Sequence, residues 1–262
     1  MVPKLLAHLN ISHVSVASHS GGDIYLMNLV LTYPHLLHPE KPYVCFFAPW
    51  VHYSHSKVTS MLATELLPAF MIGKFGSVGK FVNNNVVPLV GLSGSFIHGV
   101  SGPFLRTEAA ELSSHSNSTS PDISLDDPKV VEELREHIMK FMYAESVEGA
   151  SQDAQLFLRR SGPWNAPNVE WNDFDDAVLL LSRHLSEGNQ GDRTWAIDCF
   201  HAEHDQLVGD KGRDWFDSIW VPSQGYLYLS EKVKGTEHNF LMDPAFGASE
   251  KWLQRVSAAW QA

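Results

Sequence analysis

Residues 13–23 decide the fold, and they read His13-Val14-Ser15-Val16-Ala17-Ser18-His19-Ser20-Gly21-Gly22-Asp23. The two valines favour a strand, and the two glycines mark a sharp turn. After the turn, Leu26, Leu29 and Val30 recur at helical spacing. Asp23 falls in the first turn of that helix, where a carboxylate suits the helix dipole. The stretch therefore predicts a short strand, a tight turn and an apolar helix, with Ser20 at the turn.

A serine between a strand and a helix is in a position that suits a nucleophile. The turn lifts the hydroxyl of Ser20 away from the sheet, and the backbone N–H groups at the helix N-terminus can bind a negative charge that develops on an oxygen. The same pattern also fits a structural alternative, in which a Ser/Gly turn only caps the helix. Residues elsewhere in the chain must decide between the two.

The segment Ser18-His19-Ser20-Gly21-Gly22 resembles the Gly-x-Ser-x-Gly nucleophile elbow of the α/β-hydrolase superfamily. Ser18 stands where the superfamily has its first glycine, so a small residue is kept there. The resemblance implies that Ser20 is the nucleophile and that the backbone N–H of Gly21 belongs to the oxyanion hole.

Two later stretches resemble the acid and histidine loops of the same superfamily, in the chain order serine, acid, histidine. Residues 195–201 read as a strand, and the residues after it place Asp205 at the acid position. Residues 225–230 read as a further strand, and residues 234–241 place His238 at the base position. Because the three matches occur in order and each follows a strand, the chain is identified as similar to serine esterases, lipases and thioesterases. The implied catalytic residues are Ser20, Asp205 and His238.

Other acids and histidines near the same strand ends compete for these roles: Glu203, Asp210, His201 and His204. The two carboxylates are rivals of Asp205, which is favoured because the match to the acid loop falls on it. The two histidines become rivals of His238 only if the last strand is misplaced. Trp50 ends an apolar strand over residues 43–50 and either lines the site or packs in the core, and packing is favoured.

The composition argues against several classes of partner. The chain has 262 residues, a formal net charge of −11 and 44% hydrophobic residues. The negative charge argues against a nucleic-acid partner and against a basic membrane-binding surface. The sequence has neither a transmembrane pattern nor a signal-peptide pattern, so we expect no membrane span and a cytoplasmic location. Cys45 and Cys199 fall in predicted strands and are expected to be reduced and buried.

Three pairs of histidines have a spacing seen in metal sites, with two residues between the members of each pair: His35 and His38, His52 and His55, and His201 and His204. No cysteine or carboxylate cluster at short spacing completes a set of four ligands around any pair. We therefore expect no metal site, and no pattern in the sequence indicates a cofactor.

The elements expected along the chain predict an α/β fold with a mostly parallel sheet of the α/β-hydrolase type. Residues 1–51 and 195–262 form the predicted core, which corresponds to the C-terminal part of that fold. Residues 52–194 show no convincing strand and exceed what a crossover helix needs, so a large helical lid insertion is predicted there. Helices are expected at residues 58–75, 128–142, 152–159, 174–185, 212–220 and 248–260.

The resemblance has one large departure, because the superfamily places about four further strands before the elbow strand. These strands are absent from the sequence. The elbow strand would then be an edge of the sheet, and we expect self-association through it. The missing part would also carry the loop that usually donates the second oxyanion N–H.

The resulting prediction is a serine hydrolase that acts on an ester or a thioester through an acyl-enzyme. The apolar composition of the predicted lid favours a small-molecule substrate with a lipophilic acyl part. An acyl transferase that uses the same site is an alternative. The absent strands favour a different class, a non-catalytic or impaired hydrolase-like protein, and a further alternative is an incomplete chain of a longer hydrolase.

Overall fold

The computed structural model describes residues 1–63, 148–187 and 194–261, together with residues 129, 130, 133, 134, 137, 138 and 141. The chain divides into two compact units, one made of Met1–Gly73 with Ala150–Ala262 and one made of Lys74–Gly149. The sheet and the helices that surround it lie in the first unit.

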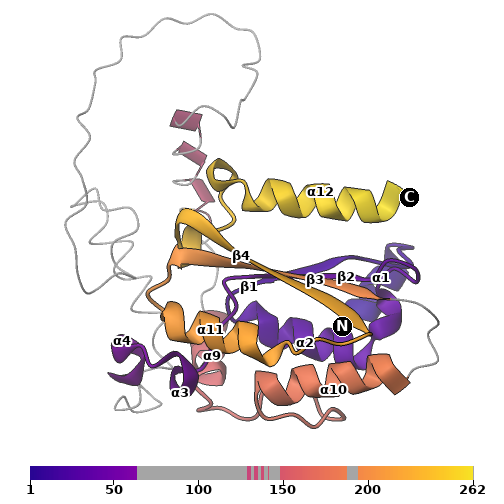
Figure 1. The fold of residues 1–262 in the computed structure, drawn as a ribbon, viewed down its shortest axis with the longest axis horizontal. Helices are drawn as coiled ribbons and strands as arrows, with labels where there is room; N and C mark the ends of the chain where they lie inside the picture. Colours follow the sequence, from indigo (N-terminus) through magenta and orange to yellow (C-terminus); the bar gives the residue numbers. More distant parts are fainter. Residues whose placement is uncertain are drawn as a thin grey trace, which may run out of the picture. The chain divides into compact units, whose positions relative to one another are not determined.

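A four-stranded parallel sheet forms the centre of the first unit (Figure 1). Its order is β1-β2-β3-β4, with β1 at Val16–His19, β2 at Tyr43–Phe47, β3 at Trp195–His204 and β4 at Tyr226–Glu237. Each neighbouring pair of strands is parallel. The C-terminal ends of the strands therefore meet at one edge of the sheet, and the predicted α/β class with a parallel sheet is confirmed.

Helices cover both faces of this sheet. In Figure 1, α12 lies on one side, and α2, α10 and α11 lie on the other. The longer helices are α1 Val2–His8, α2 Gly22–Thr32, α9 Glu148–Phe157, α10 Phe174–Glu187, α11 Gly209–Ile219 and α12 Ala248–Gln261. The short ones are α3 Tyr53–Ser56 and α4 Thr59–Ala63, with 3-10 turns η1 Pro34–Leu36, η3 His238–Phe240 and η4 Pro244–Phe246.

The sequence of β2 explains why the sheet carries a helical layer on each face. All five of its residues are buried. Val44 and Phe46 pack into the larger apolar cluster, to which α2, α10 and α11 also contribute. The alternate residues Tyr43, Cys45 and Phe47 belong to a second cluster, against which α12 packs. Since successive side chains of a strand point to opposite faces, a continuous apolar strand needs cover on both.

β4 is longer than the sequence predicts. A loop is expected from residue 234, whereas β4 continues to Glu237. Its pairing with β3 extends to His204 and Glu237, across an irregularity between Ala202 and His204. Gly235 has a φ of 73° there, and its N–H donates to Oε2 of Glu203 at 2.8 Å. The glycine thus absorbs the irregularity, and the strand runs directly into the candidate base at residue 238.

Most of the predicted lid lies outside the described residues. Of the helix expected at 58–75, only α4 is described, and the helix expected at 128–142 lies largely outside. Phe174 and Val178 of α10 pack into the main apolar cluster of the sheet. The described residues 150–187 therefore share the core of the first unit, and the lid role and limits of residues 52–194 stay predictions.

β1 lies at one end of the sheet in the described part of the chain. It pairs with β2 over Val16–His19, and Val14 forms an isolated parallel bridge with Leu37. The elbow strand therefore has the edge position expected from the sequence, at least among the described residues. Self-association through this edge stays a prediction.

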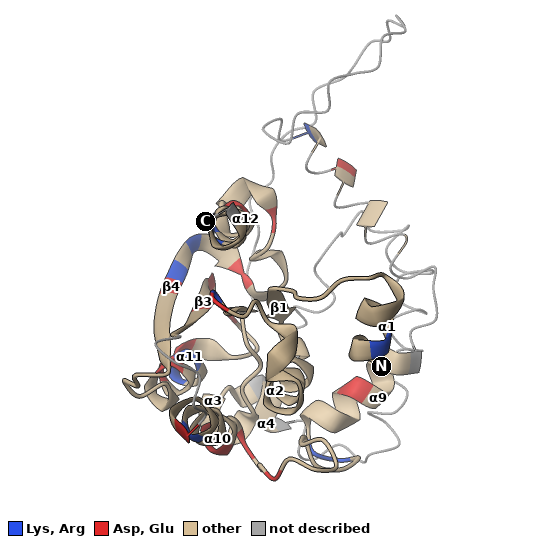
Figure 2. Cartoon of the chain, turned by 90° about the vertical axis from the view of Figure 1, so that its right-hand side faces the viewer, with Lys and Arg blue, Asp and Glu red and all other residues tan. Residues whose placement is uncertain are grey.

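Figure 2 shows acidic positions spread over several elements, including α9 and α10, and basic positions on β4. Cys45 and Cys199 are both free and buried, as predicted. None of the helices in the described ranges is long and apolar enough to cross a membrane.

Candidate active site

Ser20 lies on the sharp turn between β1 and α2. Its backbone is in the left-handed region, with a φ of 53°, which is strained for a serine. Its N–H donates to the carbonyl oxygen of Phe47 at 3.0 Å, and its carbonyl oxygen accepts the N–H of Asp23 at 3.1 Å. These bonds tie the turn to β2 and to α2, so the surrounding structure holds the strained serine at the C-terminal edge of the sheet.

The three residues predicted from the sequence lie in hydrogen-bond contact. Nε2 of His238 is 2.8 Å from Oγ of Ser20, and Nδ1 of the same ring is 2.7 Å from Oδ2 of Asp205. Ser20 directly follows β1, Asp205 follows β3 and His238 follows β4. Because parallel strands end at one edge, the fold brings together side chains that are 218 positions apart in the chain.

Asp205 is held by the backbone that follows it. Its Oδ1 accepts the N–H groups of Leu207 at 2.9 Å and of Val208 at 2.8 Å. Burial alone would raise the pKa of Asp205, but the hydrogen bond and charge of His238 and these two N–H groups outweigh burial and hold the pKa below its usual value. The carboxylate therefore stays ionised and can stabilise a positive charge on the ring of His238.

His19, the residue before Ser20, contacts the backbone of the candidate base. Its Nε2 is 2.8 Å from the carbonyl oxygen of His238, and the two ring centroids are 5.4 Å apart. Burial lowers the pKa of His19, and the hydrogen bond to the carbonyl offsets only part of this shift. The contact joins β1 to the turn that carries His238. No sequence signal pointed to it, because 219 positions separate the two residues.

The four residues that compete for the acid and base roles differ in their contacts and exposure. Oε2 of Glu203 accepts a backbone N–H of β4, and Asp210 pairs with an arginine on its own helix, α11. Nε2 of His201 is 2.8 Å from Oδ1 of Asp217 on α11. The side chain of His204 is 70% exposed. These contacts of the four rivals do not involve Ser20, and the choice of Asp205 and His238 stays a prediction.

Cys199, His201 and Asp217 form a cluster whose residue types can ligate a metal. Their potential ligand atoms lie within 4.8 Å of one another. Local spacing did not reveal this cluster, because β3 supplies two of the residues and α11 the third. Asp217 already accepts hydrogen bonds from His201, Tyr228 and Ser230. A metal would have to replace these bonds, and the expected absence of a metal site stays a prediction.

Asp23, three residues after Ser20, is a fully buried carboxyl. Neither of its oxygens has a well-aligned hydrogen-bond partner among the described residues. Burial raises the pKa of Asp23 well above its usual value, and the nearby backbone N–H groups of Ile24 and Trp50 offset only part of this shift. The carboxyl therefore keeps its proton to a higher pH than an exposed aspartate does.

The substitution Asp23→Asn is expected to raise the free energy of unfolding by about 1–3 kcal/mol near pH 8. The folded carboxyl binds its proton more tightly than the unfolded one, so the stability of the wild type falls as the pH rises above the unfolded pKa of 3.8. Asparagine has a similar shape and no charge, which removes this fall. Urea unfolding of both proteins at a series of pH values measures the difference. It should shrink toward zero near pH 4, and a difference that does not change with pH would contradict the explanation.

The ring of Phe157, the last residue of α9, lies against Gly21. A Cβ on residue 21 would be 2.2 Å from Cζ of this ring, so only glycine fits there without displacing the ring. The indole N–H of Trp50 donates to the carbonyl oxygen of Phe157 at 3.3 Å, and the ring centroids of Trp50 and Phe157 are 6.0 Å apart. Trp50 is buried in the main cluster, which confirms the favoured packing role. No sequence pattern indicated that Phe157 lies beside the elbow.

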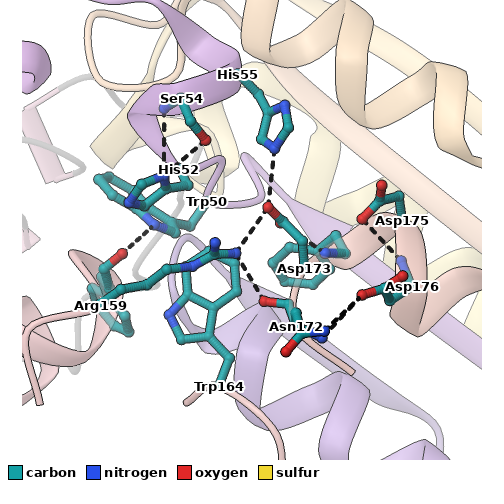
Figure 3. A network of polar contacts seen from close by, with 12 residues as sticks. Trp50, His52, Ser54, His55, Arg159, Trp164, Asn172, Asp173, Asp175 and Asp176 are labelled. Atoms are coloured by element: carbon teal, nitrogen blue, oxygen red, sulfur yellow. Dashed lines mark hydrogen bonds and ion pairs between the residues drawn. The ribbon is translucent and has the colours of Figure 1, made fainter. Parts of the chain in front are cut away.

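A polar cluster fixes the chain just after α9 (Figure 3). The guanidinium of Arg159 lies 4.2 Å from the ring centroid of Trp164 and 2.8 Å from Oδ2 of Asp173. The same carboxylate oxygen is 2.9 Å from Nε2 of His55, which belongs to α3 after β2. His52 lies in the same cluster, and burial lowers its pKa to about 4. The cluster therefore connects the end of α9 to the segment that follows β2.

No protein-family model matches the chain, and no curated protein sequence matches it significantly. Several solved structures are similar to it. A carboxylesterase from the thaumarchaeon Nitrososphaera gargenis is 12% identical with a TM-score of 0.47, over 98% of this chain and 70% of that one. A protein assigned as the non-heme bromoperoxidase BpoC of Mycobacterium tuberculosis H37Rv is 13% identical with a TM-score of 0.42. The match covers 100% of this chain and 72% of that one. Esterase E22 is 11% identical with a TM-score of 0.41, and the match covers 98% of this chain and 64% of that one.

These likenesses are weak at such identities and TM-scores. The resemblance to the α/β-hydrolase fold therefore rests on the chain's own sheet. Its four strands are parallel and follow the order of the sequence, and the three candidate residues come directly after β1, β3 and β4.

Proposed function

We propose that the protein is a serine hydrolase that cleaves an ester or a thioester through an acyl-enzyme. The observation that carries the proposal is the continuous series of contacts from Asp205 through the ring of His238 to Oγ of Ser20, at 2.7 Å and 2.8 Å. These distances lie within the reach that proton transfer between a nucleophile and its base requires.

The first half of the reaction forms the acyl-enzyme. Nε2 of His238 takes the proton of Ser20 while Oγ bonds to the carbonyl carbon of the substrate. Asp205 keeps Nδ1–H oriented and stabilises the charged ring. The carbonyl oxygen becomes negative and accepts the N–H of Gly21. Gly21 lies at the N-terminal end of α2, where backbone N–H groups have no partner within the helix. The carbon–oxygen or carbon–sulfur bond then breaks, and the leaving group receives the proton from His238.

The second half of the reaction regenerates the serine. His238 removes a proton from water, and the water oxygen bonds to the acyl carbon. The bond from that carbon to Oγ of Ser20 breaks, the acid leaves, and Oγ recovers its proton from the ring. An alcohol or thiol in place of water would give acyl transfer by the same residues, which keeps an acyl transferase as the alternative.

Apolar side chains beside the elbow favour a small-molecule substrate with a lipophilic acyl part. The ring of Phe157 lies against Gly21, and Trp50 packs beside that ring. An acyl chain bound at Ser20 would therefore meet aromatic surface, and its burial there would contribute about 0.8 kcal/mol for each methylene removed from water.

A fluorophosphonate probe tests the proposal directly, because it reacts with an activated serine. The wild type should be labelled on the peptide that contains Ser20, and Ser20→Ala should lose the label. Ser18→Ala is the matched control, since it removes a hydroxyl on the same strand whose oxygen has no hydrogen-bond partner in the described structure. A folded wild type that takes no label would instead support the non-catalytic alternative.

A further inference from the structure

We infer that Phe157 is a specificity-determining residue of this site, and that its ring limits the length of the acyl group bound beside Gly21. The inference rests on the proposed function, because it assumes that the carbonyl group of the substrate lies between Oγ of Ser20 and the N–H of Gly21.

The ring meets Gly21 end-on. A Cβ on residue 21 would lie 2.2 Å from Cζ, 2.5 Å from Cε2 and 2.6 Å from Cε1 of Phe157. All three atoms belong to the tip of the ring, and all three distances are shorter than real Cβ contacts. The ring therefore fills the volume that the side chain of the residue after the nucleophile would otherwise occupy.

This position places the ring close to any bound acyl group. A carbonyl oxygen that accepts the N–H of Gly21 lies about 3 Å from that nitrogen, so the acyl carbons begin within a few ångströms of the same residue. Phe157 is only partly buried, whereas Trp50 beside it is 6% exposed. The residue as a whole therefore keeps some accessible surface for a ligand, while its neighbour Trp50 packs in the main cluster.

Three features hold the backbone around Phe157 in place. The indole N–H of Trp50 donates to the carbonyl oxygen of Phe157. Leu158, the next residue, is buried in the main cluster. Arg159 binds the carbonyl oxygen of Asn172 and the carboxylate of Asp173. The backbone that carries the ring is therefore held beside Gly21, and an acyl chain has to fit beside the ring.

The test compares p-nitrophenyl esters from acetate to decanoate with the wild type, Phe157→Ala and Leu156→Ala. The wild type should hydrolyse esters up to a limiting chain length and lose activity on the longer ones. Phe157→Ala should raise kcat/KM for decanoate relative to acetate at least tenfold, because pocket changes of even one methylene alter discrimination by about 10- to 200-fold. Leu156→Ala is the control, since it shortens a neighbouring side chain of α9 that packs against the same cluster, and its ratio should stay within about threefold of the wild type.

A second measurement tests the contact without relying on turnover. Gly21→Ala adds a methyl group where the ring lies, so it should lower the midpoint of thermal unfolding. Combining it with Phe157→Ala should make the added methyl nearly harmless, so that the double variant unfolds close to Phe157→Ala alone. An equal loss from Gly21→Ala in both backgrounds would overturn the inference.

The outcomes separate the inference from the proposed function. A wild type that is labelled at Ser20, together with an unchanged chain-length profile in Phe157→Ala, overturns the inference and leaves the hydrolase proposal intact. A folded wild type that is neither labelled nor active overturns both. The unfolding measurements then still report whether the ring and Gly21 are in contact.

Discussion

Replacing His238 by alanine is expected to lower kcat for ester hydrolysis by about 10⁴- to 10⁶-fold. The ring lies 2.8 Å from Oγ of Ser20, and without it the hydroxyl has no base to take its proton during attack. The loss corresponds to about 5–8 kcal/mol of transition-state stabilisation. Initial rates with p-nitrophenyl acetate, measured at equal concentrations of folded protein, give the ratio.

His204→Ala is the matched control for this prediction. It removes a histidine from the same rim of the sheet, but the side chain is 70% exposed. We expect its kcat to stay within about twofold of the wild type, since changes to an exposed side chain are usually close to neutral. If His238→Ala keeps more than a tenth of the wild-type rate, or if both variants lose activity equally, His238 is not the base.

The second large effect is expected from Asp205→Asn, which should lower kcat by about 10⁴-fold. The carboxylate accepts Nδ1–H of His238 at 2.7 Å and so keeps Nε2 free to take the serine proton. An asparagine can donate to Nδ1 instead, which favours the opposite tautomer and removes the negative charge that stabilises the imidazolium. Steady-state kinetics of the variant, with urea unfolding to verify its fold, measure the effect.

Asp210→Asn serves as the control for the acid. Asp210 is 77% exposed and pairs with Arg213 on the surface of α11, so its neutralisation should change kcat by less than about twofold. A loss in Asp210→Asn comparable to that in Asp205→Asn would show that net charge, and not the contact with His238, controls the rate.

The sheet and the candidate residues could be predicted because their signals are local. Ser20 lies between a strand and two glycines, and the apolar run of β2 marks a strand covered on both faces. Asp205 and His238 each directly follow a strand. In a parallel sheet such positions meet at one edge, so the resemblance of the three loops, together with their place after strands, was enough to predict that the three side chains converge.

The features that were missed depend on contacts between distant parts of the chain. Phe157 belongs to a helix whose sequence shows no link to Gly21, and only the packing of α9 brings them together. Asp23 fits a helix N-terminus by sequence, yet the fold buries it completely. β4 extends beyond its predicted end where the N–H of Gly235 binds the side chain of Glu203 on β3. The sequence of β4 contains no pattern that indicates this contact. Local patterns carry no information on such long-range neighbours.

β3 and β4 are paired over a longer stretch than β1 and β2, and this difference affects how local opening would separate the candidate site residues. Asp205 and His238 sit at the ends of β3 and β4, which are paired from Trp195–Tyr226 to His204–Glu237. Ser20 directly follows β1, which in the described part of the chain is paired with β2 over Val16–His19. Fraying of β1 from β2 would break the contact of His19 with the carbonyl oxygen of His238 and carry the hydroxyl away, while the imidazole and the carboxylate stay joined. Local opening, at a cost below the free energy of global unfolding, would then be sufficient to separate the proposed nucleophile from its proposed base and, on reclosing, to restore their contact.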